Sequence, residues 1–280
     1  YSSVQLNNVE YAQFADKTIK LSDLSTVTSP VLATKAAIYM GATDVVTTAN
    51  SGTTIYGNAG TEIVTLSNYG GSTLPVPFSE YINSITLDQN VDQVNLFLPS
   101  SLYQFQQAGN TIKVFDITGK TLIVSAPVQG DANGTLLSFP DGTASAKLAA
   151  GVMTVGGAAI SASAPSFVSP TLTDNVASTL TSTKSQAYLA ANDVYTVGNS
   201  GQLVYGNSGY EKVNMAPPDF YGNGVYNVVY DQNIDEIDHS TQLLSNYRFL
   251  QTGNTLNWYN STGLKGSIPV QGDADGTVFR

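Results

Sequence analysis

The sequence predicts an all-β protein built from two tandem β-rich modules. The first observation is a long internal repeat, in which residues 44–64 (DVVTTANSGTTIYGNAGTEIV) return 149 positions later as residues 193–213 (DVYTVGNSGQLVYGNSGYEKV). The second is a series of short β-branched or alternating runs bounded by Gly, Asn, Asp or Pro. A fixed long period of this kind indicates a tandem array of similar structural units.

Further repeated segments extend the match over both modules. The offset falls from 149 to 142 along the chain, so short deletions lie in the intervening loops. Arrays of this kind build length and surface more often than they build an active site. The pairs are residues 88–94 with 231–237, 108–120 with 252–264, and 127–135 with 269–277.

Short strands and tight turns are expected throughout each module. Asn133-Gly134 and Asp141-Gly142 suit the left-handed positions of hairpin turns. We therefore expect β-solenoid or β-roll turns plus antiparallel hairpins, with a β-sandwich as the alternative. Residues 29–39 and 178–191 carry Ala, Leu and Lys, which favour helices. One or two helical turns before each module are therefore an open alternative to strands in these segments. The expected strands of the first module are residues 54–56, 63–66, 82–87, 94–98, 111–115, 121–124 and 136–139.

Composition and repeats together divide the chain into four parts. Residues 1–36 are the tail of a preceding module and a lead-in, and residues 37–162 are the first β-module. Residues 163–185 form a Ser/Thr/Pro-rich linker, in which Pro165 and Pro170 keep the chain extended. Residues 186–280 form the second β-module, which looks incomplete at its C-terminal end.

The N-terminal segment resembles the part that the second module lacks. Phe14, Asp16 and Thr18 have the Phe-x-Asp-x-Thr spacing of the turn at residues 139–143 of the first module. One interpretation is that the chain was cut from a longer array. The other is that residues 9–21 complete a neighbouring module by adding strands to its open edge, within a chain or between chains.

The charge and composition exclude several classes of partner. The formal net charge is −10, which argues against nucleic acid and against an anionic membrane surface. The chain has no cysteine, so disulfides and thiolate metal sites are excluded. No run of about 18 apolar residues is present, so we expect no helical membrane insertion.

A glycine-rich segment recurs in both modules, as residues 57–64 (GNAGTEIV) and 206–213 (GNSGYEKV). It resembles the nonapeptide G-G-x-G-x-D-x-U-x of RTX proteins, the type I-secreted β-roll family. In that family the Asp and backbone carbonyls hold Ca²⁺, which makes Glu62 and Glu211 candidate ligands. Asn58 and Asn207 replace the second Gly and Glu replaces Asp, so turns of a solenoid without metal are an equal alternative.

Two further acidic patterns are candidate Ca²⁺ sites because they combine carboxylate and amide oxygens. The pattern D-x-N-x-D resembles the start of an EF-hand loop but lacks its Gly and final Glu, so these side chains either bind Ca²⁺ or face water. The pattern G-D-A-[ND]-G suits a hard cation or a plain turn. The residues are Asp88, Asn90 and Asp92, Asp231, Asn233 and Asp235, Asp131 and Asn133, and Asp273 and Asp275.

Catalytic and sugar-binding interpretations find less support. His239 is the only histidine and follows Asp238, but a triad is built in space and no catalytic motif accompanies it. Exposed tyrosines would stack on sugar rings, yet tyrosine is also common in strands. Tyr56 with Tyr205 and Tyr103 with Tyr247 recur in both modules, which favours core roles.

The module layout resembles the tandem β-modules of large secreted bacterial surface proteins, namely RTX-type adhesins and S-layer proteins. The run at residues 14–21 (FADKTIKL) is similar to the ending that follows such rolls. The resemblance implies a non-enzymatic extracellular structural protein at the bacterial cell surface. It would assemble with itself into a surface layer or filament, with Ca²⁺ as a candidate stabiliser. The alternative is a carbohydrate-binding or adhesive module of a larger secreted protein, with surface polysaccharide as partner.

Overall fold

The described part of the chain is all-β, which confirms the predicted fold class. Its only helices are two single 3-10 turns, η3 (Ser100–Leu102) and η4 (Leu244–Asn246). The chain divides into two compact units, residues 1–31 and residues 32–280. The computed structural model describes residues 11–13, 18–20, 36–48, 50–66, 82–175, 180, 185–207, 209–215, 225–239, 244–270 and 276–280.

The N-terminal unit contains one described hairpin. Strands β1 (Tyr11–Gln13) and β2 (Thr18–Lys20) pair antiparallel, with Ala12 opposite Ile19.

The first module of the larger unit is a two-sheet solenoid. The chain alternates between the sheets, so that β3, β5, β7 and β11 pair in parallel in one sheet and β4, β6, β8 and β12 pair in parallel in the other. Antiparallel strands β9 and β10 extend the first sheet, and β13 to β15 extend the second. The strands are β3 (Ala37–Tyr39), β4 (Val45–Thr48), β5 (Thr54–Tyr56), β6 (Ile63–Leu66), β7 (Ile85–Leu87), β8 (Gln93–Asn95), β9 (Gln104–Ala108), β10 (Thr111–Phe115), β11 (Leu122–Pro127), β12 (Thr135–Phe139), β13 (Gly142–Ala149), β14 (Val152–Val155) and β15 (Ala158–Ala159).

The second module repeats this plan. Strands β16, β18, β20 and β24 pair in parallel in one sheet, and β17, β19, β21 and β25 pair in parallel in the other. Antiparallel β23 and β22 follow β24, as β10 and β9 follow β11. The strands are β16 (Gln186–Tyr188), β17 (Val194–Val197), β18 (Leu203–Tyr205), β19 (Lys212–Met215), β20 (Val228–Tyr230), β21 (Glu236–Asp238), β22 (Arg248–Thr252), β23 (Thr255–Asn260), β24 (Gly263–Pro269) and β25 (Val278–Phe279).

The core consists of aliphatic side chains stacked from one rung of the solenoid to the next. Val46, Val64, Val94 and Leu137 lie abreast on successive strands of one sheet, and all four are fully buried. Alternation along each short strand places one side chain inside and its neighbours outside. Burying one such side chain contributes about 1.5–3 kcal/mol.

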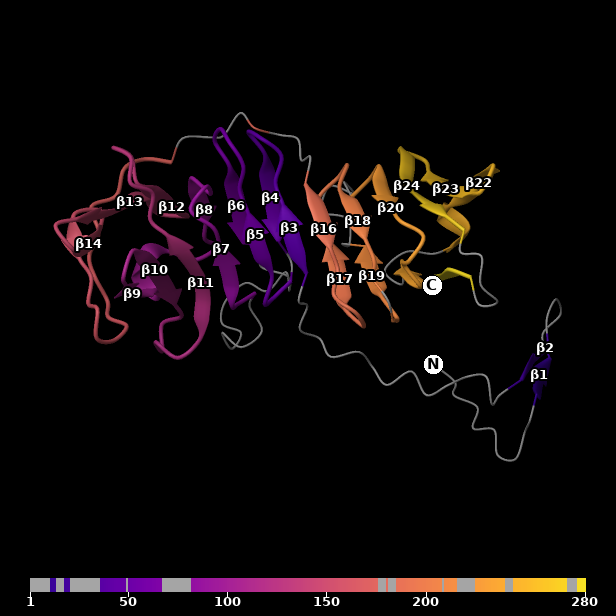
Figure 1. Cartoon of the computed structure of the whole chain (residues 1–280), viewed down its shortest axis with the longest axis horizontal. Helices are drawn as coiled ribbons and strands as arrows, with labels where there is room; N and C mark the ends of the chain where they lie inside the picture. Colours follow the sequence, from indigo (N-terminus) through magenta and orange to yellow (C-terminus); the bar gives the residue numbers. More distant parts are fainter. Residues whose placement is uncertain are drawn as a thin grey trace. The chain divides into compact units, whose positions relative to one another are not determined.

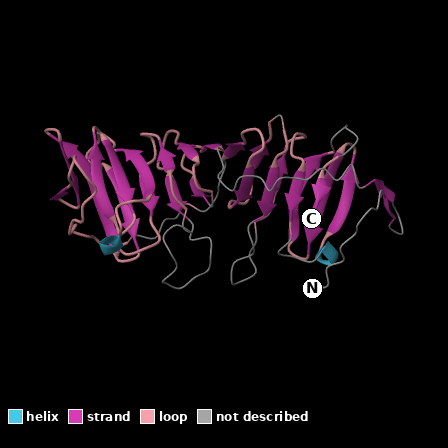
Figure 2. Cartoon of the chain, turned by 90° about the horizontal axis from the view of Figure 1, so that it is seen from below, coloured by secondary structure: helices cyan, strands magenta, loops and turns pink. Residues whose placement is uncertain are grey.

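The two modules share one sheet. Strands β3 and β16 pair antiparallel, with Ile38 opposite Ala187, and join both modules into a twelve-stranded sheet. Figure 1 shows β3 and β16 side by side where the indigo and orange parts of the larger unit meet. Figure 2 shows the strands of this unit side by side, with loops gathered at their ends. Both segments with an open helical alternative therefore contain strands.

The segment expected to be a linker packs on the first module where it is described. Ser166 forms a bridge with Phe105 of β9, and Thr173 forms a bridge with Thr143 of β13. Asn175 Nδ2 donates to the carbonyl of Phe139 at 2.7 Å. Residues 163–175 are thus a strap on the first module, whereas residues 176–179 and 181–184 lie outside the described residues.

Candidate functional site

Glu62 and Glu211 lie at equivalent corners of the two modules, and both are fully buried. Glu62 precedes β6, and its Oε1 accepts the N–H of Thr43 at 3.0 Å from the preceding rung. Glu211 precedes β19, and it accepts the N–H groups of Asn192 and Asn207, each at 3.1 Å. Each carboxylate therefore ties neighbouring turns of the solenoid together through backbone donors.

The next rung places a second carboxylate beside each glutamate. Asp92 Oδ2 accepts the Glu62 N–H at 2.7 Å, and Asp235 Oδ2 accepts the Glu211 N–H at 2.8 Å. Burial raises the pKa of Glu62, and the charge of Asp92 adds to this effect. Burial also raises the pKa of Glu211, with the charges of Asp235 and Asp231 as lesser causes. Each pair therefore brings two carboxyl groups together in a site that disfavours negative charge.

The two glutamates differ in how their second oxygen is satisfied. Both oxygens of Glu211 accept backbone hydrogen bonds. Glu62 Oε2 is buried and has no hydrogen-bond partner among the described residues. A buried acceptor without a partner is costly. Glu62 Oε2 is accordingly the oxygen of this corner best suited to a proton or a cation.

Asp88 and Asp231 bind the backbone of the preceding rung. Asp88 Oδ1 accepts the N–H of Gly57 at 2.9 Å and of Asn90 at 3.1 Å. A Cβ atom on Gly57 would lie 2.8 Å from the Asn90 carbonyl carbon, so this close approach requires glycine. Asp231 makes the same contacts to Gly206 and Asn233, at 2.9 and 3.1 Å. The D-x-N pattern thus forms a turn that is held to a glycine of the neighbouring rung.

The remaining predicted ligands form a turn in the first module. Asp131 Oδ1 accepts the N–H groups of Asn133 and Gly134, at 3.1 and 2.6 Å. The Asn133 carbonyl accepts a hydrogen bond from the Ser145 hydroxyl. Asp273 and Asp275 lie outside the described residues.

The structure brings together only part of the predicted ligand set. It pairs Glu62 with Asp92 and Glu211 with Asp235, as described above. Over the described ranges, no three His, Asp or Glu side chains converge in an arrangement that would hold a metal ion. A Ca²⁺ ion at either pair would need backbone carbonyls or water to complete its usual six to eight oxygen ligands.

The second module carries two basic groups where the first has aliphatic side chains. His239 corresponds to Leu96 in the repeat, is buried, and packs against Tyr247 and Trp258 at ring-centroid distances of 4.9 and 5.9 Å. Burial lowers the pKa of His239 to about 4. Lys265 is also buried, and burial lowers its pKa. A neutral imidazole at this position acts as a core side chain.

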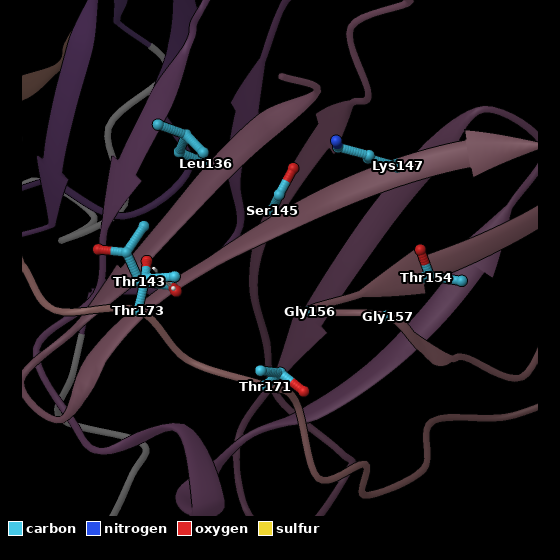
Figure 3. Close-up of a pocket in the computed structure, with 9 residues that line it drawn as sticks. All are labelled: Leu136, Thr143, Ser145, Lys147, Thr154, Gly156, Gly157, Thr171 and Thr173. Atoms are coloured by element: carbon cyan, nitrogen blue, oxygen red, sulfur yellow. Dashed lines mark hydrogen bonds between the residues drawn. The ribbon is translucent and has the colours of Figure 1, made fainter. Parts of the chain in front are cut away.

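A groove lies over the outer face of β13 and β14 in the first module, with a volume of about 440 Å³. Figure 3 shows hydroxyl side chains and Lys147 around it. Thr143 Oγ1 donates to Asn175 Oδ1 at 2.6 Å and Thr173 Oγ1 donates to the Thr143 carbonyl at 3.2 Å, so these hydroxyls already hold the strap. The lining residues are Leu136, Thr143, Ser145, Lys147, Thr154, Gly156, Gly157, Thr171 and Thr173.

Four tyrosines form a row across the module junction on the outer face of the shared sheet. Tyr56 stacks on Tyr39 and Tyr188 stacks on Tyr205, each at 4.8 Å, and Tyr39 meets Tyr188 edge to face at 5.5 Å. The expected core role is wrong for Tyr56, which is 37 % exposed, and correct for Tyr103, which is buried. Each stacked pair covers one face of each of its two rings, so a sugar would have to bind the parts of the row that remain exposed.

Asn50 and Asn199 are structural residues whose role is not evident from the sequence. Each is buried and makes hydrogen bonds to the other module, at Thr196 and Thr47 respectively. In the sequence each begins an Asn-Ser-Gly run, at residues 50–52 and 199–201, which is typical of a turn. The sequence signal that could have identified these two residues is their recurrence at the offset of 149 that the surrounding repeat has.

Comparison with protein-family models, with curated proteins and with solved structures finds no match. Within the described residues, no helix has the length and apolar character needed to cross a membrane.

Proposed function

We propose that this chain is a non-enzymatic extracellular structural protein of the bacterial cell surface. It assembles with itself into a surface layer or filament, and Ca²⁺ stabilises the assembly. The single observation that carries the proposal is the β3–β16 junction, where two repeated modules are joined by pairing their edge strands. Edge pairing that joins modules within a chain is also a general way to join copies of a chain.

The surface composition supports close contact between copies. The tyrosine row and its neighbours on the same face, Ala37, Thr54, Gln186 and Leu203, include no charged side chain. In a chain with a net charge of −10, such a patch lets two copies approach with little electrostatic repulsion. Stabilisation by Ca²⁺ draws support from the carboxyl pairs Glu62–Asp92 and Glu211–Asp235.

Sedimentation velocity over a range of protein concentrations tests this proposal. We expect species larger than the monomer to grow with concentration in calcium and to shrink when a chelator is added. A single monomer boundary at every concentration, unchanged by calcium, would refute both parts. If the larger species persist when the chelator is added, the structural role stands and the calcium role is excluded.

The second candidate function is carbohydrate binding, and the exposed tyrosine row is the observation that favours it. It predicts that Tyr39→Ala and Tyr188→Ala each weaken retention of the protein by surface polysaccharide in affinity electrophoresis. The matched control is Tyr103→Phe, because Tyr103 is buried and cannot touch a polysaccharide. Unchanged retention of the two alanine variants would exclude this surface as the binding site.

A further inference from the structure

The groove over β13 and β14 is built from residues 136–173, and its walls are fixed by backbone pairing. The strap and β13 pair through Thr143 and Thr173, whose N–H groups each donate to the other's carbonyl, at 2.8 and 2.9 Å. The Thr171 N–H donates to the Gly156 carbonyl at 3.0 Å, which holds the strap to the turn between β14 and β15. A Cβ atom on Gly156 would lie 2.5 Å from the Thr171 carbonyl oxygen, so this approach requires glycine. The groove is therefore a preformed feature of the first module.

Strand alternation places polar side chains along the floor of the groove. Two alanines of β13 are buried in the core, so the alternating residues Ser145 and Lys147 point to the outer face. Lys147 lies directly opposite Thr154 of β14 in the antiparallel pairing, which brings their Cβ atoms within about 4.5–5.5 Å of each other. Figure 3 shows these side chains together with those that the strap contributes.

Three polar groups of the groove have no hydrogen-bond or ion-pair partner among the residues that the structure describes. They are Lys147 Nζ, Thr154 Oγ1 and Thr171 Oγ1. Lys147 and Thr171 are exposed, and Thr154 is half-buried. The other hydroxyl groups of the lining donate within the first module. The three unpartnered groups are therefore available to a ligand.

The chemistry of these groups matches a sugar that carries a carboxylate. A lysine ammonium forms a charge-assisted hydrogen bond with a carboxylate, and Lys147 is the single charged residue of the lining. A threonine hydroxyl both donates and accepts, as the hydroxyl groups of a sugar do. The threonine methyl groups and Leu136 offer apolar surface to the C–H groups of a sugar ring. The groove volume of about 440 Å³ lies within the range of small-molecule sites, about 300–1,000 Å³.

Two other classes of ligand fit this groove less well. A nucleic acid is bound through clustered basic groups and aromatic rings that stack on bases, whereas the lining has one basic residue and no aromatic ring. A peptide that adds a strand needs a free sheet edge, whereas this groove lies over the face of β13 and β14.

We propose that this groove binds an acidic saccharide. Lys147 pairs with the sugar carboxylate, and Thr154 and Thr171 form hydrogen bonds with the sugar hydroxyl groups. The site goes beyond the proposed structural role and is separate from the tyrosine row. The groove belongs to the seven-stranded sheet, whereas the tyrosine row lies on the twelve-stranded sheet.

Isothermal titration calorimetry of the full chain tests the ligand class with two matched probes. Digalacturonate carries two carboxylates, and its methyl ester has the same rings and hydroxyl groups without the charge. We expect digalacturonate to bind at least about tenfold more tightly than the ester, and added salt to narrow this difference. Equal affinities for the two probes, or no binding of digalacturonate at millimolar concentration, would overturn the proposal.

Substitutions in the groove test its location. Lys147→Gln should weaken digalacturonate binding by about tenfold or more, since it removes the charged donor. Thr171→Val keeps the shape of the side chain without its hydroxyl and should weaken binding by about threefold to tenfold. The control is Lys120→Gln, because Lys120 is an exposed lysine that does not line the groove. The melting temperature of each variant verifies that it is folded.

Two results would place the site elsewhere and so contradict the proposal. One is an equal loss of affinity in Lys147→Gln and Lys120→Gln, which would indicate a general effect of charge. The other is a loss in Tyr188→Ala with full binding by Lys147→Gln, which would move the site to the tyrosine row. Self-assembly is measured separately by sedimentation, so neither result decides the proposed structural role.

Discussion

Asn50 and Asn199 occupy equivalent positions in the two modules, and each binds the backbone of the other module. Asn50 Oδ1 accepts the Thr196 N–H at 2.7 Å, and Asn50 Nδ2 donates to the Thr196 carbonyl at 2.9 Å. Asn199 makes the same two bonds to Thr47, at 2.7 and 2.8 Å. Together with the β3–β16 pairing, these hydrogen bonds relate the two sides of the junction by a local two-fold. Each side-chain amide forms the two backbone hydrogen bonds that a neighbouring strand would otherwise form.

Close backbone approach is part of the same junction. A Cβ atom on Gly198 would lie 2.9 Å from the Thr47 carbonyl oxygen. Only glycine leaves room for that carbonyl without a shift of the backbone. The junction therefore depends on matched residues from segments about 150 positions apart.

Removing either asparagine should destabilise the junction. Asn50→Ala leaves the N–H and C=O of Thr196 without these partners, and Asn199→Ala does the same to Thr47. We expect each to lower the free energy of unfolding by about 2–4 kcal/mol, measured by chemical denaturation. Asn90→Ala is the control, since its exposed amide bonds only to Asp88 and its loss should cost under about 0.5 kcal/mol.

The two corner glutamates should respond differently to amide substitution. In Glu62→Gln the amide can donate to Asp92, and a disfavoured charge is removed, so the free energy of unfolding at pH 7 without calcium should rise by about 1 kcal/mol. In Glu211→Gln the new amide faces the N–H of Asn192 or Asn207, which should cost about 1–3 kcal/mol. Equal losses in both variants would contradict this difference.

Calcium binding at the first corner is tested with the same variant. If Ca²⁺ binds Glu62 and Asp92, added calcium should raise the melting temperature of the wild type, and Glu62→Gln should abolish most of that rise. The control is Asp174→Asn, which alters an exposed carboxylate outside every predicted ligand set. A full calcium response in Glu62→Gln would remove this corner from the list of metal sites.

His239 should make the second module sensitive to acid. Its pKa is about 4 in the folded chain and about 6.5 when unfolded, so the folded state binds fewer protons. Stability is therefore fully present above pH 6.5 and falls as the pH drops towards 4, by on the order of 3 kcal/mol. His239→Leu, which copies Leu96 of the first module, should remove this loss in urea titrations at pH 7 and pH 4.5.

The glutamates titrate with the opposite sign. The raised pKa of Glu62 and Glu211 means that the folded state holds their protons more tightly, so acid favours folding at these sites. Comparing His239→Leu with the wild type cancels this contribution. An identical loss of stability between pH 7 and pH 4.5 in both proteins would show that His239 is not its source.

Short strands next to strong turn signals were the most predictable part of the fold. The expected ranges 54–56, 63–66 and 111–115 match β5, β6 and β10, because alternation and glycine turns act within a few residues. Residues 37–39 and 186–188 are less clear in sequence, since they lie in segments 29–39 and 178–191, whose Ala, Leu and Lys also favour helices. These two segments are strands because they pair with each other across the junction.

The candidate site was less predictable because its chemistry depends on long-range partners. The sequence suggests Glu62 and Asp92 as candidate oxygen ligands, but it does not show that they meet across a rung or that Thr43 donates to Glu62. The role of Asn50 depends on Thr196, which lies 146 positions away. Repetition located the important positions, and only packing revealed what each one contacts.

Electron microscopy of the purified chain in calcium tests the central claim, self-assembly, most directly. The account predicts ordered sheets or filaments with a regular repeat, which the Asn50→Ala/Asn199→Ala double variant should form poorly. Single particles of monomer size at every protein concentration, with or without calcium, would contradict it.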